Sequence, residues 1–297
     1  MRGYSEAMWV PPELLDFAIS AGDMAFDVCP TNRNLYLSEI EKVKLPANSS
    51  KVLGKAVESL YFRIYEIVTH HVHEFAESKE YAKINPWDVL HGQDPDLVTR
   101  SIQEAKSKCR AEDFAITDVG ALGEKLKKIL EFEAHLSTSL VHNQLSRMED
   151  HRVKAFYDDL MHFSIEPTYR AELLGFSTPV TPDFVYSGKA IGDIKTGNWH
   201  EFKRLSFTGY ALAYECDRHL DMNSGLIHQV LFKDSLRVPL HYNTKIEPIT
   251  NELRTQFANR RDAKLEVLRN GKDPGKPDRK ICEQNECPFI PHCWGKK

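Results

Sequence analysis

The sequence predicts an α/β protein of the α+β kind, in which a large helical N-terminal portion precedes a small sheet. In the first half, apolar residues recur at three- and four-residue steps over long stretches, which is the period of an amphipathic helix. Beyond about residue 162, short alternating or apolar runs are separated by glycine, proline and serine, which is typical of strands joined by turns. The order is helices, strands, helix, strands, helix.

Three helical segments are expected before residue 162, at 13–28, 52–72 and 114–145. The turn-rich text NPWDVLHGQDPD (85–96) predicts a loop between the second and the third. Three or four strands are expected in 163–195, a helix in 199–220, strands at 225–232 and 236–242, and a last helix at 248–269. The predicted organisation is therefore a helical portion (1–162), a core (163–247) and a cysteine-bearing tail (248–297), together forming one compact unit.

The composition excludes several classes of protein. The formal net charge is -4 and the pI is about 6.4, so DNA contact would have to come from a local patch or through metal ions. No run reaches the roughly 18 apolar residues that a membrane span needs. The N-terminus lacks the basic and apolar regions of a secretory signal. We expect a cytoplasmic protein that does not bind membranes.

Two carboxylates and a lysine lie on neighbouring predicted strands. Asp183 and Asp193 are ten residues apart on either side of a short turn, so an antiparallel pairing can bring them together. Oxygen ligands of this kind suit magnesium or manganese. Lys195 follows Asp193 by two residues and therefore faces the same side of the strand. An ammonium there can orient the attacking water or offset phosphate charge, whereas a chance D-x-K near a turn is the structural alternative.

The cysteines are distributed unevenly. Cys282, Cys287 and Cys293 crowd the tail, and Cys29 lies near the other end in the sequence CPT. Four thiolates are the usual complement of an iron–sulfur cluster or of structural zinc. Zinc sites favour two tight pairs, so the one-plus-three arrangement with wide gaps favours iron–sulfur. The scattered Cys109 and Cys216 fit ordinary buried thiols better.

The run TPDFVYSGKAIGDIKTG resembles two motifs of RecB-like nucleases, which carry an Asp on one strand and D/E-x-K on the next. The text FTGYALAYE resembles the last motif of that group and places its tyrosine at Tyr210. The text GKAVE resembles the group's helical motif, with Glu58 where a histidine is usual. The usual glutamine of the last motif falls on Ser206.

The cysteine layout, with C-P-T-x-R-x-x-Y-L near Cys29, resembles the CRISPR-associated RecB-like iron–sulfur exonuclease family, in its archaeal form with an extended helical N-terminal half. This resemblance implies a restriction-endonuclease-like core of the PD-(D/E)XK superfamily. It also implies a [4Fe–4S] cluster, with [2Fe–2S] as the alternative, that ties the two chain ends together. The resemblance leaves the helical stretch at about 80–150 uncovered.

The family implies a metal-dependent deoxyribonuclease that trims DNA ends, preferably single-stranded ones, as prespacers are prepared for CRISPR adaptation. Its partners would be DNA and the subunits of the spacer integrase. The predicted site residues hold Mn2+ or Mg2+, act on the water or phosphate, or support the site: Glu58, Asp183, Asp193, the Ile194 carbonyl, Lys195 and Tyr210. Two alternatives stay open, namely a DNA-end binding subunit that cuts poorly and a redox-sensing iron–sulfur protein.

Overall fold

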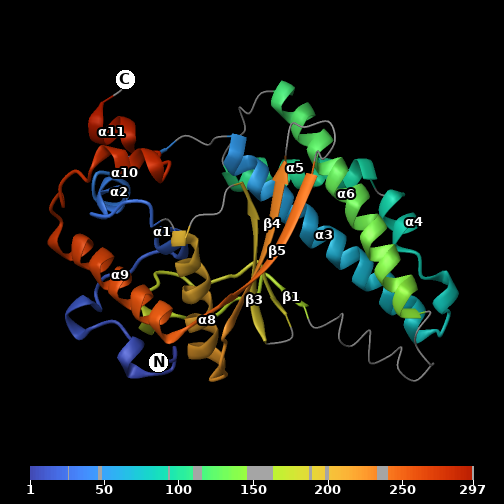
Figure 1. The fold of residues 1–297 in the computed structure, drawn as a ribbon, viewed down its shortest axis with the longest axis horizontal. Helices are drawn as coiled ribbons and strands as arrows, with labels where there is room; N and C mark the ends of the chain where they lie inside the picture. Colours follow the sequence, from blue (N-terminus) through green and yellow to red (C-terminus); the bar gives the residue numbers. More distant parts are fainter. Residues whose placement is uncertain are drawn as a thin grey trace.

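The computed structural model describes residues 1–25, 27–45, 49–92, 94–109, 116–145, 163–186, 189–197, 201–232 and 240–295. A five-stranded sheet stands in the middle of the molecule with helices on both sides (Figure 1). The long helices of the first half lie on the right of the view. The C-terminal helices and both chain termini lie on the left. This arrangement confirms the predicted mixed α/β class.

The sheet runs in the order β1 (Phe163–Ile165), β2 (Phe184–Tyr186), β3 (Ala190–Thr196), β4 (Ser224–Phe232) and β5 (Leu240–Pro248). Neighbouring strands are antiparallel except β3 and β4, which are parallel. Parallel neighbours need a crossover, and α8 (Arg204–Arg218) lies between these two strands in the chain. The sheet therefore places β2 and β3, the strands of the predicted acidic pair, side by side.

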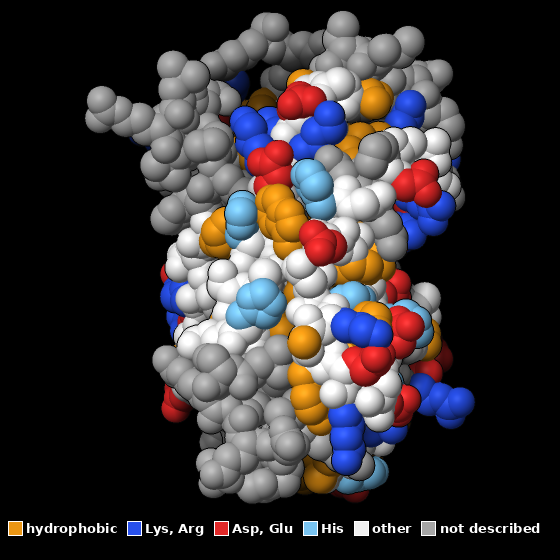
Figure 2. Space-filling view, turned by 90° about the vertical axis from the view of Figure 1, so that its right-hand side faces the viewer, with side chains coloured by type: hydrophobic (Ala, Val, Ile, Leu, Met, Phe, Trp, Pro, Cys, Tyr) orange, Lys and Arg blue, Asp and Glu red, His pale blue; other side chains and the backbone are white. Residues whose placement is uncertain are grey.

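Four helices form the right-hand layer: α3 (Ser49–Glu77), α4 (Pro86–His91), α5 (Asp94–Cys109) and α6 (Ile116–Leu145). Leu60 of α3 and Ile129 of α6 are fully buried in one apolar cluster, which also takes in Val230 of β4. Acidic, basic and histidine side chains lie interspersed on the outer face of this layer (Figure 2). Among the described residues, no helix has the combination of length and apolar character that a membrane crossing requires.

The other face of the sheet is covered by α8, which packs with α9 (Asn251–Asn270). Phe207 of α8 and Ile191 of β3 share this second apolar cluster. A Cβ added at Gly209 would lie 2.8 Å from the Phe257 ring, so glycine is what permits the close approach of α8 and α9. Two short helices, α10 (Arg279–Gln284) and α11 (Ile290–Trp294), end the described chain.

The helix predicted at 13–28 is wrong. The described residues of this stretch form η2 (Pro12–Leu14) and α1 (Ala21–Ala25) rather than one continuous helix. Between them Ile19 bridges Phe176, with Ile19 N 3.0 Å from Gly175 O and Ser177 N 2.9 Å from Ile19 O. Tertiary pairing therefore overrides the helical period here. The other short helices are η1 (Glu6–Met8), α2 (Arg33–Leu35), η3 (Tyr36–Ile40), η4 (Tyr81–Lys83), η5 (Glu172–Leu174) and η6 (Glu201–Lys203).

The loop predicted at 85–96 is also wrong in part, because it contains α4 and the start of α5. Pro86 occupies the first turn of α4, where a missing backbone N–H costs nothing. Asn85 Nδ2 donates to Asp88 Oδ2 at 2.6 Å across that turn. The strand predicted at 236–242 is β5, which extends to Pro248 and pairs with the whole of β4. The predicted residues 236–239 lie outside the described residues.

Glu215 of α8 joins distant parts of the chain in the interior. It is fully buried and accepts from Arg254 Nη2 at 2.8 Å, from Arg2 Nη1 at 3.0 Å and from Gly3 N at 2.8 Å. Its Oε1 also accepts from Met222 N at 3.0 Å. The N-terminal residues, α8 and α9 are thus held at one carboxylate, and α8 is fixed over the sheet.

Replacing Glu215 by Gln tests this connection. The variant leaves the buried Arg254 guanidinium without its counter-charge, so we expect a loss of about 3–5 kcal/mol in the free energy of unfolding. Urea unfolding measures the difference. A matched control is Glu124→Gln, whose partner Lys127 is exposed. This variant should change the free energy of unfolding by the ~0–1 kcal/mol typical of surface pairs. Equal effects of the two variants would contradict the connecting role.

Candidate active site

The predicted acidic pair lies where β2 and β3 meet. The antiparallel register pairs Phe184 with Gly192, so Asp183 and Asp193 occupy the next opposing positions. Asp183 Oδ2 accepts a hydrogen bond of 2.6 Å from Ile194 N, which fixes its carboxylate beside β3. A Cβ at Gly192 would overlap the Phe184 ring, at 1.9 Å from Cε2. Glycine before Asp193 therefore lets the two strands bring their carboxylates together.

Asp193 is buried, with 2% of its surface exposed. Its Oδ2 atom forms an ion pair with the ammonium of Lys195, 2.5 Å away. As predicted from their spacing, Asp193 and Lys195 face the same side of β3.

Glu58 reaches the same place from α3. Its two carboxylate oxygens accept from Lys55 Nζ at 2.7 and 2.6 Å, a contact one helical turn back along α3. Glu58 is nearly buried, whereas Lys55 is partly exposed. The structure thus brings Glu58 into the acidic group but gives it a lysine partner. The spacing of three residues was a visible signal for that pair, and sequence reasoning missed it.

The carboxylates act on one another electrostatically. Burial raises the pKa of Asp183 well above its usual value, and the charges of Asp193 and Glu58 raise it further. Two carboxylates in a poorly solvated site cannot both ionise without a nearby cation. Lys195 supplies one positive charge, and its own pKa is raised by Asp193 and Asp183 against the opposing effect of burial. A further cation would therefore bring the net charge of the site closer to neutral.

Tyr210 projects from α8 toward this group. Burial raises its pKa, as do the charges of Asp193, Asp183 and Glu58 in that order. Lys203, at the start of α8, has a lowered pKa because of burial and of its proximity to Lys195. The charges of Asp193, Asp183 and Glu58 act on Tyr210, and that of Asp193 also acts on Lys203, which the motifs had not indicated.

The helical stretch that the resemblance left uncovered borders the site. Lys108, the penultimate residue of α5, pairs with Glu104 at 2.9 Å and lies 3.8 Å from Glu166, just beyond β1. Burial opposes ionisation of Lys108, but the hydrogen bond to Glu104 and the charges of Glu166, Glu104 and, least, Glu58 raise its pKa. Glu104 also accepts from Ser59 and Arg63 of α3, which fastens α5 to the helix that carries Glu58.

All the groups that line the acidic site offer oxygen or ammonium atoms, so its donor set fits a hard divalent cation such as Mg2+ or Mn2+. The observation on this structure that supports the fit is the opposed position of Asp183 and Asp193 on β2 and β3, because a bound cation would relieve the repulsion that raises the pKa of Asp183. Over the described ranges, no three His, Cys, Asp or Glu side chains already surround a common point in the manner of a single-ion site. Asp183 and Asp193 are the residues that could hold such an ion.

The four predicted cluster cysteines come together on the left of the molecule. Cys29, Cys282, Cys287 and Cys293 are all buried and belong to one small apolar cluster with Phe289. Burial, together with the charges of the other three thiols, raises the pKa of Cys287 to about 11. The four thiols share this buried cluster, although among the described residues no three of them already surround a common point. Their sulfur atoms are the kind of ligand that an iron–sulfur cluster takes. Cys109 and Cys216 lie outside this cluster.

Several polar contacts hold the two chain ends together around the thiols. Asn285 Nδ2 donates to Val28 O at 2.8 Å, and Thr31 Oγ1 donates to Gly275 O at 3.0 Å. These contacts join the segment around Cys29 to the tail that bears the other three cysteines. Figure 1 shows α10 and α11 stacked beside α2 in this region.

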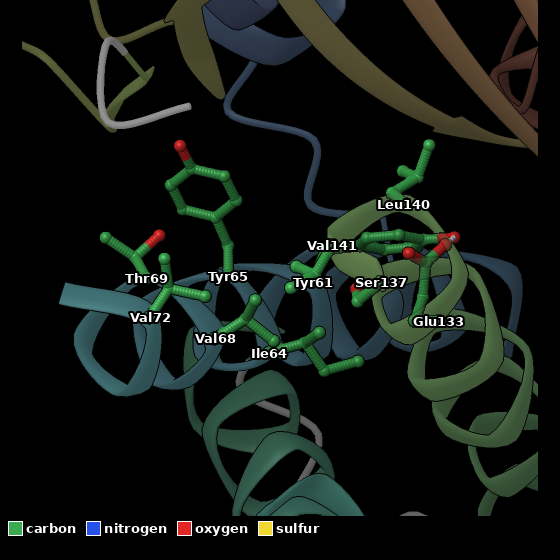
Figure 3. A pocket seen from close by; sticks show the side chains of 10 residues that line it. All are labelled: Tyr61, Ile64, Tyr65, Val68, Thr69, Val72, Glu133, Ser137, Leu140 and Val141. Carbon is green, nitrogen blue, oxygen red and sulfur yellow. Dashed lines mark hydrogen bonds between the residues drawn. The ribbon is translucent and has the colours of Figure 1, made fainter. Parts of the chain in front are cut away.

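A separate cavity of about 280 Å3 lies between α3 and α6 (Figure 3). Tyr65 projects from α3 and Leu140 from α6, and Glu133 lies near Tyr61, whose hydroxyl donates to it at 3.0 Å. Burial raises the pKa of Glu133 to about 7. A neighbouring cavity shares Tyr61 and reaches Ile194. Because side chains alternate along β3, Ile194 faces away from Asp193, and the sheet separates these cavities from the carboxylates.

Comparison with known proteins identifies the family. A model described as CRISPR-associated exonuclease Csa1 matches residues 1–296. The chain belongs to this family. A curated protein of the same name from Saccharolobus solfataricus is 24% identical over 296 residues, which cover 99% of this chain and 91% of that protein. Membership of the family confirms the resemblance drawn from the motifs and supports a nuclease role in a CRISPR system.

Replacing Asp183 by Asn tests the electrostatics of the acidic group. A carboxyl whose folded pKa is raised contributes stability that is fully present below its unfolded pKa and is lost as pH rises through the folded pKa. The asparagine does not titrate, so the metal-free variant should lose less stability as pH rises. The gain near neutral pH is about 1.4 kcal/mol for each unit by which the pKa is raised.

Urea unfolding in a chelator, repeated from pH 4 to 8, measures this difference. The exposed Asp96→Asn substitution in α5 is the control and should keep the wild-type pH dependence. A variant at Asp183 that followed the wild-type curve would show that the two carboxylates do not repel each other in the folded protein.

Proposed function

We propose that the protein is a metal-dependent DNA exonuclease with a PD-(D/E)XK core. The observation that carries the proposal is the opposed position of Asp183 and the buried Asp193 beside Lys195, on adjacent strands of a chain that belongs to an exonuclease family. Phosphodiester hydrolysis needs positive charge at the scissile phosphate and an activated water. The acidic pair and the lysine together can meet both needs.

Each residue has a distinct role in this proposal. Asp183, Asp193 and the Ile194 carbonyl would hold Mg2+ or Mn2+, which would supply positive charge at the phosphate and a water of lowered pKa. Lys195 is already positioned by Asp193 and orients the water or offsets phosphate charge. Glu58 assists from α3, and Tyr210 supports the carboxylates from α8.

We propose an iron–sulfur cluster, [4Fe–4S] rather than [2Fe–2S], at the four buried cysteines. Thiolates are the ligands that such clusters take. Cys29 precedes the core and the other three follow it, so the bound cluster would fasten the two chain ends. This role is structural, because the thiols gather with α10 and α11, whereas the carboxylates lie between β2 and β3.

The substrate that we propose is a DNA end, single-stranded near the cut, that is trimmed as a prespacer before integration. Membership of a CRISPR-associated exonuclease family supports this proposal. The partners would then be the subunits of the spacer integrase.

One observation favours a second candidate function. Lys55 binds both oxygens of Glu58, so this carboxylate is engaged by a lysine rather than left open. A site in which lysines neutralise the carboxylates can retain DNA phosphate without cutting efficiently. The second candidate is therefore a DNA-end binding subunit of the integration complex with weak cleavage.

Replacing Asp193 by Ala separates the two candidates. We expect the wild-type protein, purified without oxygen, to degrade end-labelled single-stranded DNA with Mn2+ or Mg2+ but not with chelator. The variant should cut DNA at least about 100-fold more slowly. Each 1.4 kcal/mol of lost transition-state stabilisation slows a reaction about tenfold, so this loss corresponds to two such steps. Labelled DNA and denaturing gels measure cleavage.

The control for this assay is Asp96→Asn, which should cut like the wild type. A second measurement on the same samples is DNA retention by fluorescence anisotropy. A folded wild-type protein that bound DNA ends but did not cut them would contradict the exonuclease and favour the binding subunit.

Replacing Cys287 by Ser tests the proposed cluster. Wild-type protein should contain iron and acid-labile sulfide and absorb broadly near 400 nm, as iron–sulfur proteins do. The variant should lose that absorption and much of its thermal stability, because the two chain ends are then joined only by the apolar and polar contacts. Cys216→Ser, outside the group of four, should keep both. Zinc without iron in the wild-type protein would contradict the proposal.

A further inference from the structure

Two cavities on the helical side of the sheet meet at one carboxyl group. The first, of about 280 Å3, lies between α3 and α6 (Figure 3), and the second, of about 210 Å3, lies between these helices and the sheet. Tyr61, Tyr65 and Glu133 line both cavities. Most of the other lining side chains are apolar, such as Val68 in the first cavity and Phe184 in the second. Glu133 is the one acidic side chain that the described part of the chain contributes to either wall.

A chain of hydrogen bonds ends at Glu133. The Tyr61 hydroxyl donates to Glu133 Oε1 at 3.0 Å. The same hydroxyl oxygen lies 3.4 Å from His228 Nε2, and His228 Nδ1 lies 3.2 Å from Thr244 Oγ1. Burial lowers the pKa of His228, so its ring is neutral near pH 7 and carries a single N–H. The chain therefore brings a hydrogen bond to the carboxylate but no positive charge.

The Glu133 carboxyl lacks a counter-charge from the described residues. Burial raises its pKa to about 7, and only the hydrogen bond from Tyr61 opposes the rise. A carboxylate can accept about four hydrogen bonds, and an ionised one that is buried without a positive partner is costly. A ligand that placed a positive charge beside Glu133 would remove this cost.

The walls around the carboxyl suit a cation that has an apolar body. The rings of Tyr61 and Tyr65 line the cavities beside Glu133, and tyrosine faces attract ammonium groups. His228 packs edge-on against Tyr61, with the ring centroids 5.2 Å apart, which holds that ring in place. At about 30 Å3 for each water-sized group, the first cavity has room for about nine such groups.

We propose that these cavities bind a small organic ammonium compound. Its charged group lies beside Glu133 and the two tyrosine rings, and its apolar part fills the first cavity between α3 and α6. The sheet lies between this site and Asp193, because Ile194 lines the second cavity and neighbouring side chains of a strand face opposite sides. The inference therefore goes beyond the proposed nuclease and does not depend on its metal site or on the cysteines.

Octylammonium and 1-octanol test the proposal, because they have the same size and differ in charge. At pH 8 a carboxyl with a pKa of about 7 is mostly ionised. We expect the wild-type protein to bind octylammonium at least about tenfold more tightly than 1-octanol, as measured by isothermal titration calorimetry. Glu133→Gln keeps the shape of the side chain and removes its charge, so this variant should bind the two probes equally.

The matched control is Glu131→Gln, on the exposed face of α6, which should keep the wild-type preference for octylammonium. Ser137→Leu adds apolar bulk to the wall of the first cavity and should weaken the binding of both probes. Wild-type protein that bound neither probe, or bound both equally, would overturn the inference. Octylammonium binding that was the same in wild type and in Glu133→Gln would also overturn it, because the ammonium would then lie elsewhere.

Discussion

The repulsion between the half-buried carboxylate of Asp183 and the buried carboxylate of Asp193 is the constraint around which the core is arranged. Asp183 and Asp193 oppose each other on β2 and β3 because Gly192 lets the Phe184 ring lie flat against the strand. Burial and mutual charge keep the pKa of Asp183 well above its usual value. A pair of this kind is unfavourable for stability unless a cation joins it, and such unfavourable pairs mark functional sites more often than structural ones. The surrounding lysines only partly relieve the repulsion.

The rest of the molecule holds that pair from both sides of the sheet. α3 brings Glu58 with its partner Lys55, and α8 brings Tyr210. α8 is in turn fixed by Glu215, whose partners come from the N-terminus and from α9. On the side of the cysteines, Asp27 receives Arg260 at 2.6 Å, and this ion pair joins the segment before Cys29 to α9. Positions close to the two chain ends therefore stabilise the helix that carries part of the active site.

The features predicted from sequence were those encoded locally. The helical period of the apolar residues in 52–72 and 114–145 predicted α3 and α6. The two-residue spacing of Asp193 and Lys195 predicted that they share a face of β3. One prediction that failed was the helix at 13–28, because the pairing of Ile19 with Phe176 depends on residues distant in the sequence. The ion pair of Arg33 with Asp273 joins residues 240 positions apart, so no spacing rule could have indicated it. Lys55 was within reach of such a rule, since helical pairs three residues apart are common.

Anomalous diffraction from crystals soaked in Mn2+ tests the central claim most directly. Data collected above and below the manganese absorption edge locate the ion without reference to activity. The account predicts a manganese peak between the carboxylates of Asp183 and Asp193, which disappears in crystals of the Asp193→Ala variant. Well-ordered carboxylates without a manganese peak, or a peak at another group of side chains, would contradict the assignment of this pair as the metal site.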